Sequence, residues 1–372
     1  MDHFVELPQV TSIINHGKTK SSVRLDDGIQ CDLRAVSNAE YPCALAYFTG
    51  SKEHNVALRG LARDLGYTLN EYRLAPIDED STDKPRKFHD EAGLYSALGL
   101  DCPPPELREN QGEIEAAADH SLPQLIELEN LRGTFHNHTT ASDGHNSLEE
   151  MAQAAIDLGL QYLGIADHSK ASVQANGLNE KRLLNQVHEI QVLNRGYEDE
   201  ELDFRLLAGT EVDILKDGSL DFEDDLLAQL DYSVASVHSA FTLPEAEMTE
   251  RIIKAVENPY ITMIGHLTGR LLLEREPYAV NVPEIIDACA ETGTIIELNC
   301  NPWRLDMDWR WWKLAAEKGV RCAINPDAHR TDGLQYLFYG IKIARKGWLT
   351  RDNVINCLPL DEITEALAIK RS

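Results

Sequence analysis

From residue 131 onward, short apolar runs alternate with longer amphipathic stretches, and this alternation limits the folds that the chain can adopt. Seven apolar runs have the length of strands: 133–138, 162–166, 205–208, 232–237, 262–264, 294–298 and 321–324. The stretches between them predict helices over 148–158, 180–194, 245–257, 282–292, 309–318 and 333–346. Strands and helices joined by short connections are typical of a parallel sheet, and seven such units favour a closed barrel. We therefore expect an α/β fold with its functional groups at the C-terminal ends of the strands.

Histidines and acidic residues gather where these predicted strands end. His136 and His138 are separated by one residue, so the period of two in a strand places both imidazoles on one face. A single pair of this kind is weak evidence for a metal, because packing and surface hydrogen bonds commonly satisfy histidines. Asp143 lies in the loop after the same strand. Further residues of these types follow other strands: His168, Glu211, His238, His266, Asp327 and His329.

Six of the thirteen histidines belong to this set, and so many at strand ends favour a metal site over ordinary polar residues that face water. A closed sheet would bring them to one rim. Imidazoles and carboxylates without thiolates favour zinc, manganese or iron. The ligands exceed the need of one ion, and a carboxylate such as Glu211 can bridge two ions. Such ions activate water for attack on phosphorus and neutralise charge on the phosphoryl oxygens.

The motifs around these residues resemble the PHP (polymerase and histidinol phosphatase) domain. They are Thr134-Phe-His-Asn-His-Thr-Thr-Ala-Ser-Asp-Gly144, Ile165-Ala-Asp-His-Ser169, Glu211-Val-Asp213, Ser236-Val-His-Ser239, Gly265-His266 and Asn325-Pro-Asp-Ala-His329. The resemblance implies a distorted seven-stranded barrel and a centre of three divalent ions, Mn²⁺, Zn²⁺ or Fe²⁺. It assigns metal-ligand roles to His136, His138, Asp143, His168, Glu211, His238, His266, Asp327 and His329, with Glu211 bridging. Pro326 departs from the family, which more often has Thr there, and affects only local backbone geometry.

Two arginines near the expected rim are candidates for phosphate contacts. Arg270 and Arg304 each offer a guanidinium fork that suits phosphate, although either fits equally a surface ion pair. We expect the catalytic set to be His136, His138, Glu211, Asp327 and Arg270. The remaining candidates act more indirectly: Asn299 and Asn301 would orient substrate, while His145 and Asp167 would support ligands. The other histidines, among them His54, are expected to be ordinary surface or core residues.

The first 75 residues resemble the late palm and thumb of family X DNA polymerases, whose bacterial members carry a PHP domain C-terminal to the polymerase. The matching segments are Ser22-Val-Arg-Leu-Asp-Asp-Gly-Ile-Gln-Cys-Asp-Leu-Arg34, Ala46-Tyr-Phe-Thr-Gly-Ser-Lys-Glu-His-Asn55 and Leu69-Asn-Glu-Tyr72. The expected organisation is a small α+β palm and thumb segment over 1–75, a linker with helices over 76–130 and the PHP domain over 131–372.

In that family, Asp32 corresponds to the third of three carboxylates that hold the ions for nucleotidyl transfer. The other two belong to a Gly-Asp-x-Asp motif that would precede residue 1, and one carboxylate cannot build a two-metal site. We therefore expect no DNA polymerisation by this chain, which is either a gene without its front half or a piece of a longer polymerase. Several basic residues, among them Lys52, Arg59 and Arg63, could guide DNA or simply face solvent.

The composition restricts the setting of this chemistry. A formal net charge of −27 weighs against a general nucleic-acid coat, but a cluster of cations would supply local positive charge. The sequence contains no apolar run long enough to span a bilayer and no signal pattern, so we expect a cytoplasmic protein that does not bind membranes. Its seven cysteines form no CxxC pair and are expected to be free thiols.

Together these patterns predict a metal-dependent phosphoesterase that hydrolyses DNA ends in DNA repair. The expected activity is a 3′→5′ exonuclease with 3′-phosphatase or abasic-site activity, and the expected partner is a 3′ end in single-stranded or gapped DNA. One alternative is a phosphatase of the histidinol-phosphatase type acting on a small phosphate monoester. Another is a non-catalytic DNA-binding remnant, which the intact ligand set argues against. The last is a fragment of a full family X polymerase.

Overall fold

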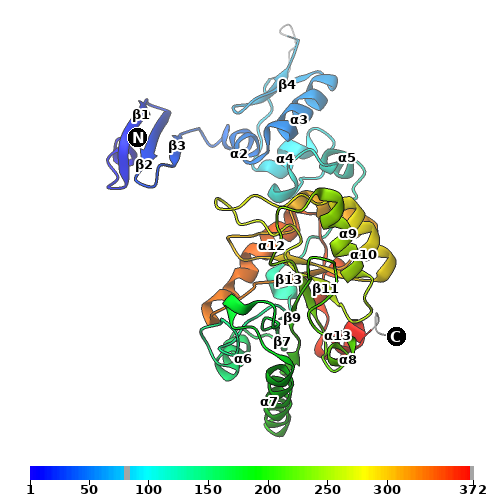
Figure 1. Cartoon of the computed structure of the whole chain (residues 1–372). Coiled ribbons are helices and arrows are strands. Elements are labelled where there is room, and N and C mark those ends of the chain that lie inside the picture. The colour runs from blue at the N-terminus through cyan, green and yellow to red at the C-terminus, as the bar shows by residue number, and fades with distance from the viewer. Residues whose placement is uncertain (79–83, 369–372) are drawn as a thin grey trace. The chain divides into compact units, whose positions relative to one another are not determined.

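The chain divides into two units, Met1–Leu122 and Pro123–Ser372, and each is described here by itself (Figure 1). The computed structural model describes residues 1–78 and 84–368. Within these residues no helix is long and apolar enough to cross a membrane. The expected boundary of the barrel at residue 131 and the unit boundary at Pro123 differ by a short segment, whose Leu125 and Ile126 are buried in the second unit.

The first unit begins with helix α1 (Asp2–Val5) and an antiparallel sheet of three strands, β1 (Val10–His16), β2 (Lys20–Leu25) and β3 (Gln30–Arg34). The central strand is the buried one, with Val23 fully covered. Asp32 lies on β3, and its carboxylate pairs with Lys20 at 3.3 Å. Of the three family carboxylates named above, this sheet carries one.

The rest of the first unit is mainly helical: α2 (Tyr41–Thr49), α3 (Lys52–Asp64), α4 (Glu91–Ser96) and α5 (Glu113–Ala118), with the hairpin β4 (Tyr67–Leu69) and β5 (Leu74–Pro76). Ser51 caps α3 by accepting a hydrogen bond from the backbone N–H of His54. Leu94 and Tyr95 of α4 pack with Leu58 of α3 in one apolar cluster. The helices α4 and α5, which fall in the segment expected to be a linker, therefore belong to the core of this unit.

The second unit contains parallel strands in two sheets. One has the order β6-β7-β8, formed by β6 (Gly133–Thr134), β7 (Tyr162–Ile165) and β8 (Arg205–Ala208). The other has the order β13-β12-β11-β10-β9, formed by β9 (Glu211–Asp213), β10 (Val234–Ser236), β11 (Met263–Ile264), β12 (Ile295–Asn299) and β13 (Cys322–Asn325). Each strand overlaps one of the expected apolar runs except β9, which was not predicted.

Single bridges join the two sheets into a ring. His168 pairs with Glu211 beyond the end of β7, and Asn137 pairs with Ala328 beyond β6 and β13. The expected α/β barrel-like fold is therefore confirmed. Its count of seven strands stays a prediction: β8 and β9 are separate elements, and the ring contains seven only if they are taken as one strand interrupted at Gly209 and Thr210.

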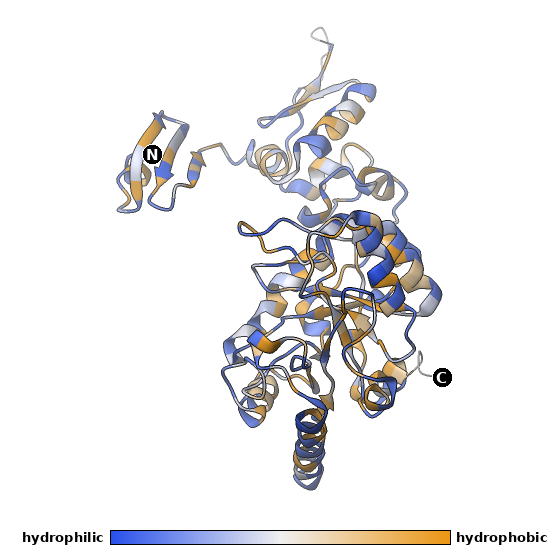
Figure 2. Cartoon of the chain, viewed as in Figure 1, coloured by the Kyte–Doolittle hydropathy of each residue, from blue (hydrophilic) through white to orange (hydrophobic). Residues whose placement is uncertain are grey.

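Helices cover the outside of this ring: α6 (Leu148–Asp157), α7 (Glu180–Asp199), α8 (Asp224–Leu227), α9 (Glu245–Val256), α10 (Val282–Thr292), α11 (Trp312–Glu317) and α12 (Leu337–Lys346). They carry both hydrophobic and hydrophilic residues, as amphipathic helices do (Figure 2). The helix α6 begins with a capping box of Ser147 and Glu150, which satisfies two backbone N–H groups. Every helix expected in this unit is present.

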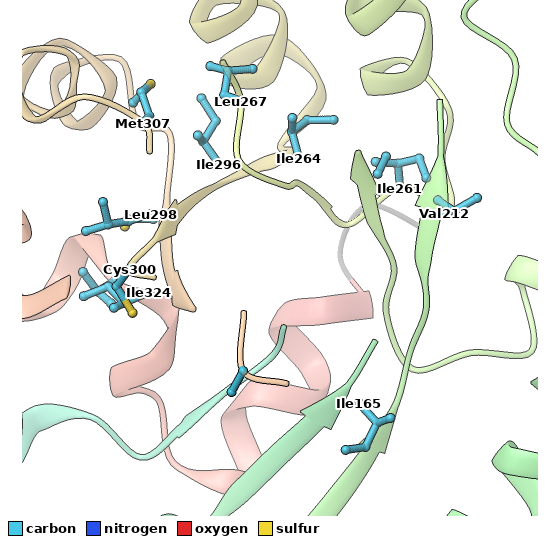
Figure 3. Packing of buried hydrophobic residues seen from close by; sticks show 14 of the residues in the cluster. Ile165, Val212, Ile261, Ile264, Leu267, Ile296, Leu298, Cys300, Met307 and Ile324 are labelled. Carbon is cyan, nitrogen blue, oxygen red and sulfur yellow. The ribbon is translucent and has the colours of Figure 1, made fainter. Parts of the chain in front are cut away.

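The strands separate two buried clusters because successive side chains point to opposite faces. Outward side chains pack against the helices, and Figure 3 shows several of them, including Ile165, Val212, Ile264, Ile296 and Ile324. Inward side chains fill the barrel: Leu207, Val234, Met263, Ile295 and Ala323. The last helix, α13 (Leu360–Ala368), contributes Ile363 and Leu367 to the same interior. The barrel is thus filled with side chains, and the polar groups lie where the strands end.

Candidate metal centre

Eight of the nine expected ligands follow the C-terminal ends of strands in the ring, Asp143 from the loop after β6, and Glu211 is the first residue of β9. Nitrogen and oxygen atoms of all of them except His266 approach one another in three groups, within 4.8 Å in each. The groups are His138, Asp143, His168 and His329; His136, His138 and Asp327; and His168, Glu211 and His238. Because His138 and His168 each occur twice, the groups share ligands and form one continuous cluster.

Glu211 is the centre of this cluster. Its Oε2 lies 2.8 Å from Nδ1 of His168 and 3.4 Å from Nε2 of His136. Its Oε1 lies 2.9 Å from Nε2 of His266 and 3.2 Å from Nε2 of His238. A buried carboxylate with imidazoles against both oxygens has the arrangement that a bridging ligand requires.

Asp327 and Asp143 flank Glu211. Oδ1 of Asp327 lies 3.2 Å from Nε2 of His138, and Oδ1 of Asp143 lies 3.3 Å from Nε2 of His329. The ring of His138 stacks on that of His168 at 4.6 Å and on that of His329 at 4.2 Å. The side chain of Asp143 is 34% exposed, so this side of the cluster opens to solvent.

Several buried imidazole nitrogens make no well-directed hydrogen bond to the described residues, although Nδ1 of His168 lies 2.8 Å from an oxygen of Glu211. They are Nε2 of His136, both nitrogens of His138, Nδ1 of His168 and Nδ1 of His266. Leaving so many buried polar atoms without a partner is costly, and native proteins rarely do so. Divalent cations would satisfy these nitrogens, and the mixture of imidazoles and carboxylates suits zinc, manganese or iron. The residues therefore fit a metal centre.

The charges of the cluster favour cations as well. Burial raises the pKa of Glu211, yet His238, His136 and His168 hold it well below its usual value. Asp327 behaves in the same way: burial opposes its ionisation, but His136 and its other cationic neighbours keep its pKa low. Both carboxylates are therefore anionic and available as ligands.

The histidines divide into two types. Burial lowers the pKa of His238 and His329, but the carboxylates beside them raise it to about 10 and about 9. In contrast, burial and the neighbouring His329 and His168 lower the pKa of His138 to about 4. Without cations the cluster thus holds protons on some imidazoles, and metal binding must displace them.

Buried polar residues surround the ligands. Glu297 on β12 accepts a hydrogen bond from Nδ1 of His136 at 2.6 Å, and Asp213 accepts one from Nδ1 of His238 at 3.0 Å. Asp167 accepts hydrogen bonds from the backbone and side chain of Thr139 and from Ser142, at 2.5 to 2.8 Å, and so holds the loop that carries Asp143. Asp167 was expected from the sequence to support ligands, whereas no such role was predicted for Glu297 or Asp213. A charged residue inside the apolar strand 294–298 was the available signal for Glu297.

The two arginines that were candidates for phosphate contacts lie in different environments. Arg270 pairs with Asp308 at 2.9 Å and donates to the carbonyl oxygens of Arg304 and Leu305, so its guanidinium is bound within its own loop. Arg304 reaches the cluster, because its Nε lies 3.3 Å from Oδ2 of Asp327. Nη1 of Arg304 is buried without a partner in the described part of the chain. The expected phosphate contact at Arg270 stays a prediction, and the guanidinium nitrogen without a partner among the described residues belongs to Arg304.

Of the other candidates, Asn299 touches the cluster by donating to Oδ2 of Asp327 at 3.0 Å. The side chain of Asn301 instead accepts from the backbone N–H of Trp303, and His145 is exposed, with its backbone N–H bound to the carbonyl of His329. His54 is a core residue, fully buried between Glu113 and Tyr95.

In the first unit, a cavity of about 680 Å³ lies between α3 and the β4–β5 hairpin. Arg59, Arg63 and Arg73 line it, together with apolar residues and Tyr67, and none of its described lining residues is acidic. Two of the basic residues from the sequence analysis thus share one surface in a strongly acidic chain.

A family model described as the PHP domain matches residues 134–301. This part of the chain is a PHP domain. Asp327 and His329 lie beyond the matched range, yet the structure places them in the same cluster as the expected ligands within that range. A second model, described as the DNA polymerase beta thumb, matches residues 44–109 and so includes the segment from α2 to α4.

Individual proteins extend the similarity beyond the PHP domain. The DNA polymerase/3′-5′ exonuclease PolX of Bacillus subtilis is 40% identical over 364 residues, which are 97% of this chain and 62% of that protein. A probable phosphatase of a Thermoanaerobacter species is 28% identical over 237 residues, 59% of this chain and 88% of that protein. The expected similarity to the C-terminal part of a family X polymerase, with its thumb and PHP domain, is confirmed.

Solved structures show a weaker likeness. A histidinol phosphate phosphatase from Lactococcus lactis, crystallised with zinc, L-histidinol and phosphate, has a TM-score of 0.43 at 16% identity, covering 58% of this chain and 93% of its own. The polymerase beta of Leishmania infantum has a TM-score of 0.26 at 25% identity over 29% of this chain and 52% of its own.

Proposed function

We propose that the chain is a metal-dependent phosphoesterase that hydrolyses DNA ends as a 3′→5′ exonuclease, with 3′-phosphatase or abasic-site activity as extensions. The observation that carries this proposal is the buried carboxylate of Glu211, which has nitrogens of five imidazoles within 3.8 Å of its two oxygens. An arrangement of this kind suits ions held side by side, as in enzymes that cleave phosphate esters.

We propose that three divalent ions, Mn²⁺, Zn²⁺ or Fe²⁺, occupy the cluster, with Glu211 as the bridging ligand. The ligands would be His136, His138, Asp143, His168, Glu211, His238, His266, Asp327 and His329. Such ions supply Lewis acidity, activation of water and neutralisation of charge on the phosphoryl oxygens.

The residues of the chain itself would bind and orient the ester. Arg304 lies against the cluster, and its Nη1 has no partner among the described residues. A phosphate oxygen would accept a hydrogen bond from this nitrogen. Arg270 would act through the loop, since it holds the carbonyl oxygens of Arg304 and Leu305. We therefore propose Arg304 as the phosphate contact and Arg270 as a residue that positions it.

DNA is the proposed substrate for two reasons. The relative with 40% identity is named a DNA polymerase/3′-5′ exonuclease, and the first unit matches a polymerase thumb. The cavity lined by Arg59, Arg63 and Arg73 would attract phosphates despite the net charge of −27. Recognition of single-stranded or gapped 3′ ends, a part in DNA repair and a cytoplasmic location stay predictions of the sequence.

A small phosphate monoester is the competing substrate. Its support is the similarity to a probable phosphatase over 88% of that protein, which is a larger share than for the polymerase relative. Both substrates would use the same metal cluster, so the choice depends on the first unit and on the loops at the rim.

Hydrolysis of labelled DNA by the purified protein tests the proposal. With Mn²⁺ we expect single-stranded and recessed 3′ ends to shorten stepwise, and the double variant His136→Ala, His138→Ala to lose the activity. A turnover of histidinol phosphate that exceeds that of DNA ends would support the competing substrate. DNA hydrolysis that persists in the double variant would exclude the cluster as the active site.

A further inference from the structure

Glu297 is a fully buried carboxylate whose neighbours are all donors of hydrogen bonds. Its Oε2 accepts from Nδ1 of His136 at 2.6 Å and from Nδ2 of Asn325 at 2.9 Å. Its Oε1 accepts from the backbone N–H of His266 at 2.9 Å and from Nδ2 of Asn299 at 3.0 Å. Four donors around one buried side chain stabilise its ionised form, and no proton on the carboxyl is needed to satisfy a neighbour.

The bond to His136 determines which nitrogen of that imidazole faces the cluster. An imidazole that binds an ion through Nε2 keeps one proton, and the carboxylate of Glu297 holds this proton at Nδ1. Nε2 then presents a lone pair. This nitrogen is buried without a hydrogen-bond partner in the described ranges and lies 3.4 Å from Oε2 of Glu211 and 3.7 Å from Oδ1 of Asp327.

The first unit also contains a buried pair of a histidine and a glutamate, but there both imidazole nitrogens have partners. Nδ1 of His54 lies 2.6 Å from Glu113, and both side chains are fully buried. However, Nε2 of His54 meets the hydroxyl of Tyr95 at 2.9 Å. Both nitrogens of His54 are therefore satisfied by the protein, whereas only one nitrogen of His136 is. The comparison distinguishes a pair that stabilises a core from one that leaves a nitrogen for a ligand.

Glu297 is also linked by hydrogen bonds to two more proposed ligands, His266 and Asp327. It fixes the backbone of His266, and Asn299 donates to both Glu297 and Oδ2 of Asp327 at 3.0 Å each. One carboxylate on the central part of β12 thus connects residues from three other strands.

We propose that Glu297 is a positioning residue for the metal centre, which orients the imidazole of His136 through Nδ1 so that Nε2 faces the cluster and can bind an ion. This inference rests on the ligand roles proposed above. A carboxylate behind a metal-bound imidazole fixes the orientation of the ring and makes it a stronger ligand. Its loss should weaken metal binding even though Glu297 itself contacts no ion.

The variant Glu297→Gln tests this role because it keeps the shape and removes the charge. The amide NH₂ of glutamine would face donors wherever it points, and His136 can accept from it only by moving its own proton to Nε2. We expect the affinity for Zn²⁺ to fall about 10- to 100-fold, measured by competition with a chelator of known affinity. The matched control is Glu113→Gln, which removes the same buried pair from the first unit and should leave zinc affinity unchanged.

A spectroscopic measurement on the zinc-loaded wild type keeps the inference falsifiable if Glu297→Gln fails to fold. Long-range ¹H–¹⁵N spectra of histidine-labelled protein should place the proton of His136 on Nδ1 and the zinc on Nε2. A proton on Nε2 would overturn the inference, as would equal zinc affinities of Glu297→Gln and the wild type. Wild-type protein that binds no zinc would overturn the ligand set itself, and this inference with it.

Discussion

Nε of Arg304 lies 3.3 Å from Oδ2 of Asp327, so the carboxylate of one proposed metal ligand also pairs with a cationic side chain at the rim of the cluster. The neighbouring Arg270 supports this geometry by holding the carbonyl oxygen of Arg304 at 2.8 Å. The rim therefore contains one guanidinium that faces the cluster and a second that fixes the loop.

Replacing Arg304 should impair the reaction more than it impairs the fold. We expect Arg304→Ala to lower kcat/KM for phosphate esters about 100-fold or more, as for other lost donors to a developing negative charge. Arg304→Lys should recover part of this loss, because it restores the charge without the fork. The control is Arg310→Ala, whose exposed guanidinium pairs with the same Asp308 that holds Arg270. Equal rates for Arg304→Ala and the wild type would remove Arg304 from the site.

The assignment of the two arginines shows what spacing in a sequence can predict. The strands of the second unit other than β9, the helices expected there and the nine residues proposed as ligands followed from hydrophobic periodicity and from residue types at strand ends. Spacing does not say which of two guanidinium groups a loop has already satisfied, since this depends on Asp308 and on backbone carbonyls brought together by folding. For that reason the spacing could not show that Arg304, and not Arg270, lies against Asp327.

Glu297 and α4 illustrate two other limits. Glu297 occupies an apolar strand, where periodicity predicts the strand but not the donors that gather around a buried carboxylate. The helix α4 is only six residues long and follows a polar stretch, so its local pattern is typical of a linker. Its burial comes from contact with α3 in the tertiary structure, which the local sequence does not encode.

The stability of the metal-free protein should fall as the pH rises through the alkaline range. The pKa of His238 is raised to about 10 and that of His329 to about 9, both above the ordinary value of 6.5. The stabilisation from these imidazolium–carboxylate pairs is fully present below about pH 6.5 and is lost as the pH rises through 9 and 10. Thermal unfolding in a chelator should therefore show a declining Tm between pH 7 and about pH 10.

The same protons oppose metal binding, so the affinity for zinc should increase with pH over this window. Chelator competition at two pH values measures the effect, and release of protons on zinc addition to weakly buffered protein is an independent check. A Tm of the metal-free protein that rises toward pH 10, or a zinc affinity that does not change, would contradict the proposed protonation of the cluster.

Two glycines should respond to alanine in opposite directions. A Cβ on Gly164 of β7 would lie 2.5 Å from the hydroxyl of Tyr232 and 2.8 Å from Cα of Phe135, inside the filled barrel. We expect Gly164→Ala to destabilise the protein by about 1–3 kcal/mol, as overpacking does. A Cβ on Gly60 in the middle of α3 would meet no atom within 4 Å. Gly60→Ala should thus stabilise its unit by about 0.4–1 kcal/mol. Chemical denaturation of both variants checks the two signs.

The arginine-lined cavity of the first unit should contribute to DNA binding and not to the chemical step. Arg59, Arg63 and Arg73 line one surface without an acidic side chain in its described lining, so each is positioned to release a counterion when a phosphate binds. Replacing any of them by alanine should weaken DNA binding alike for all sequences and reduce the slope of log K against log salt by about 1. Hydrolysis of a small phosphate ester should be unaffected, because the metal cluster belongs to the second unit.

The control for this prediction is Arg195→Ala, which removes an exposed arginine from α7 of the second unit. Salt titrations of the triple cavity variant, the control and the wild type with a single-stranded oligonucleotide give the three slopes. If all three slopes agree, the cavity does not bind DNA, and the attraction of DNA to this acidic chain must come from the metal cluster and Arg304 alone. If only the cavity variant has a smaller slope, the cavity of the first unit binds the oligonucleotide.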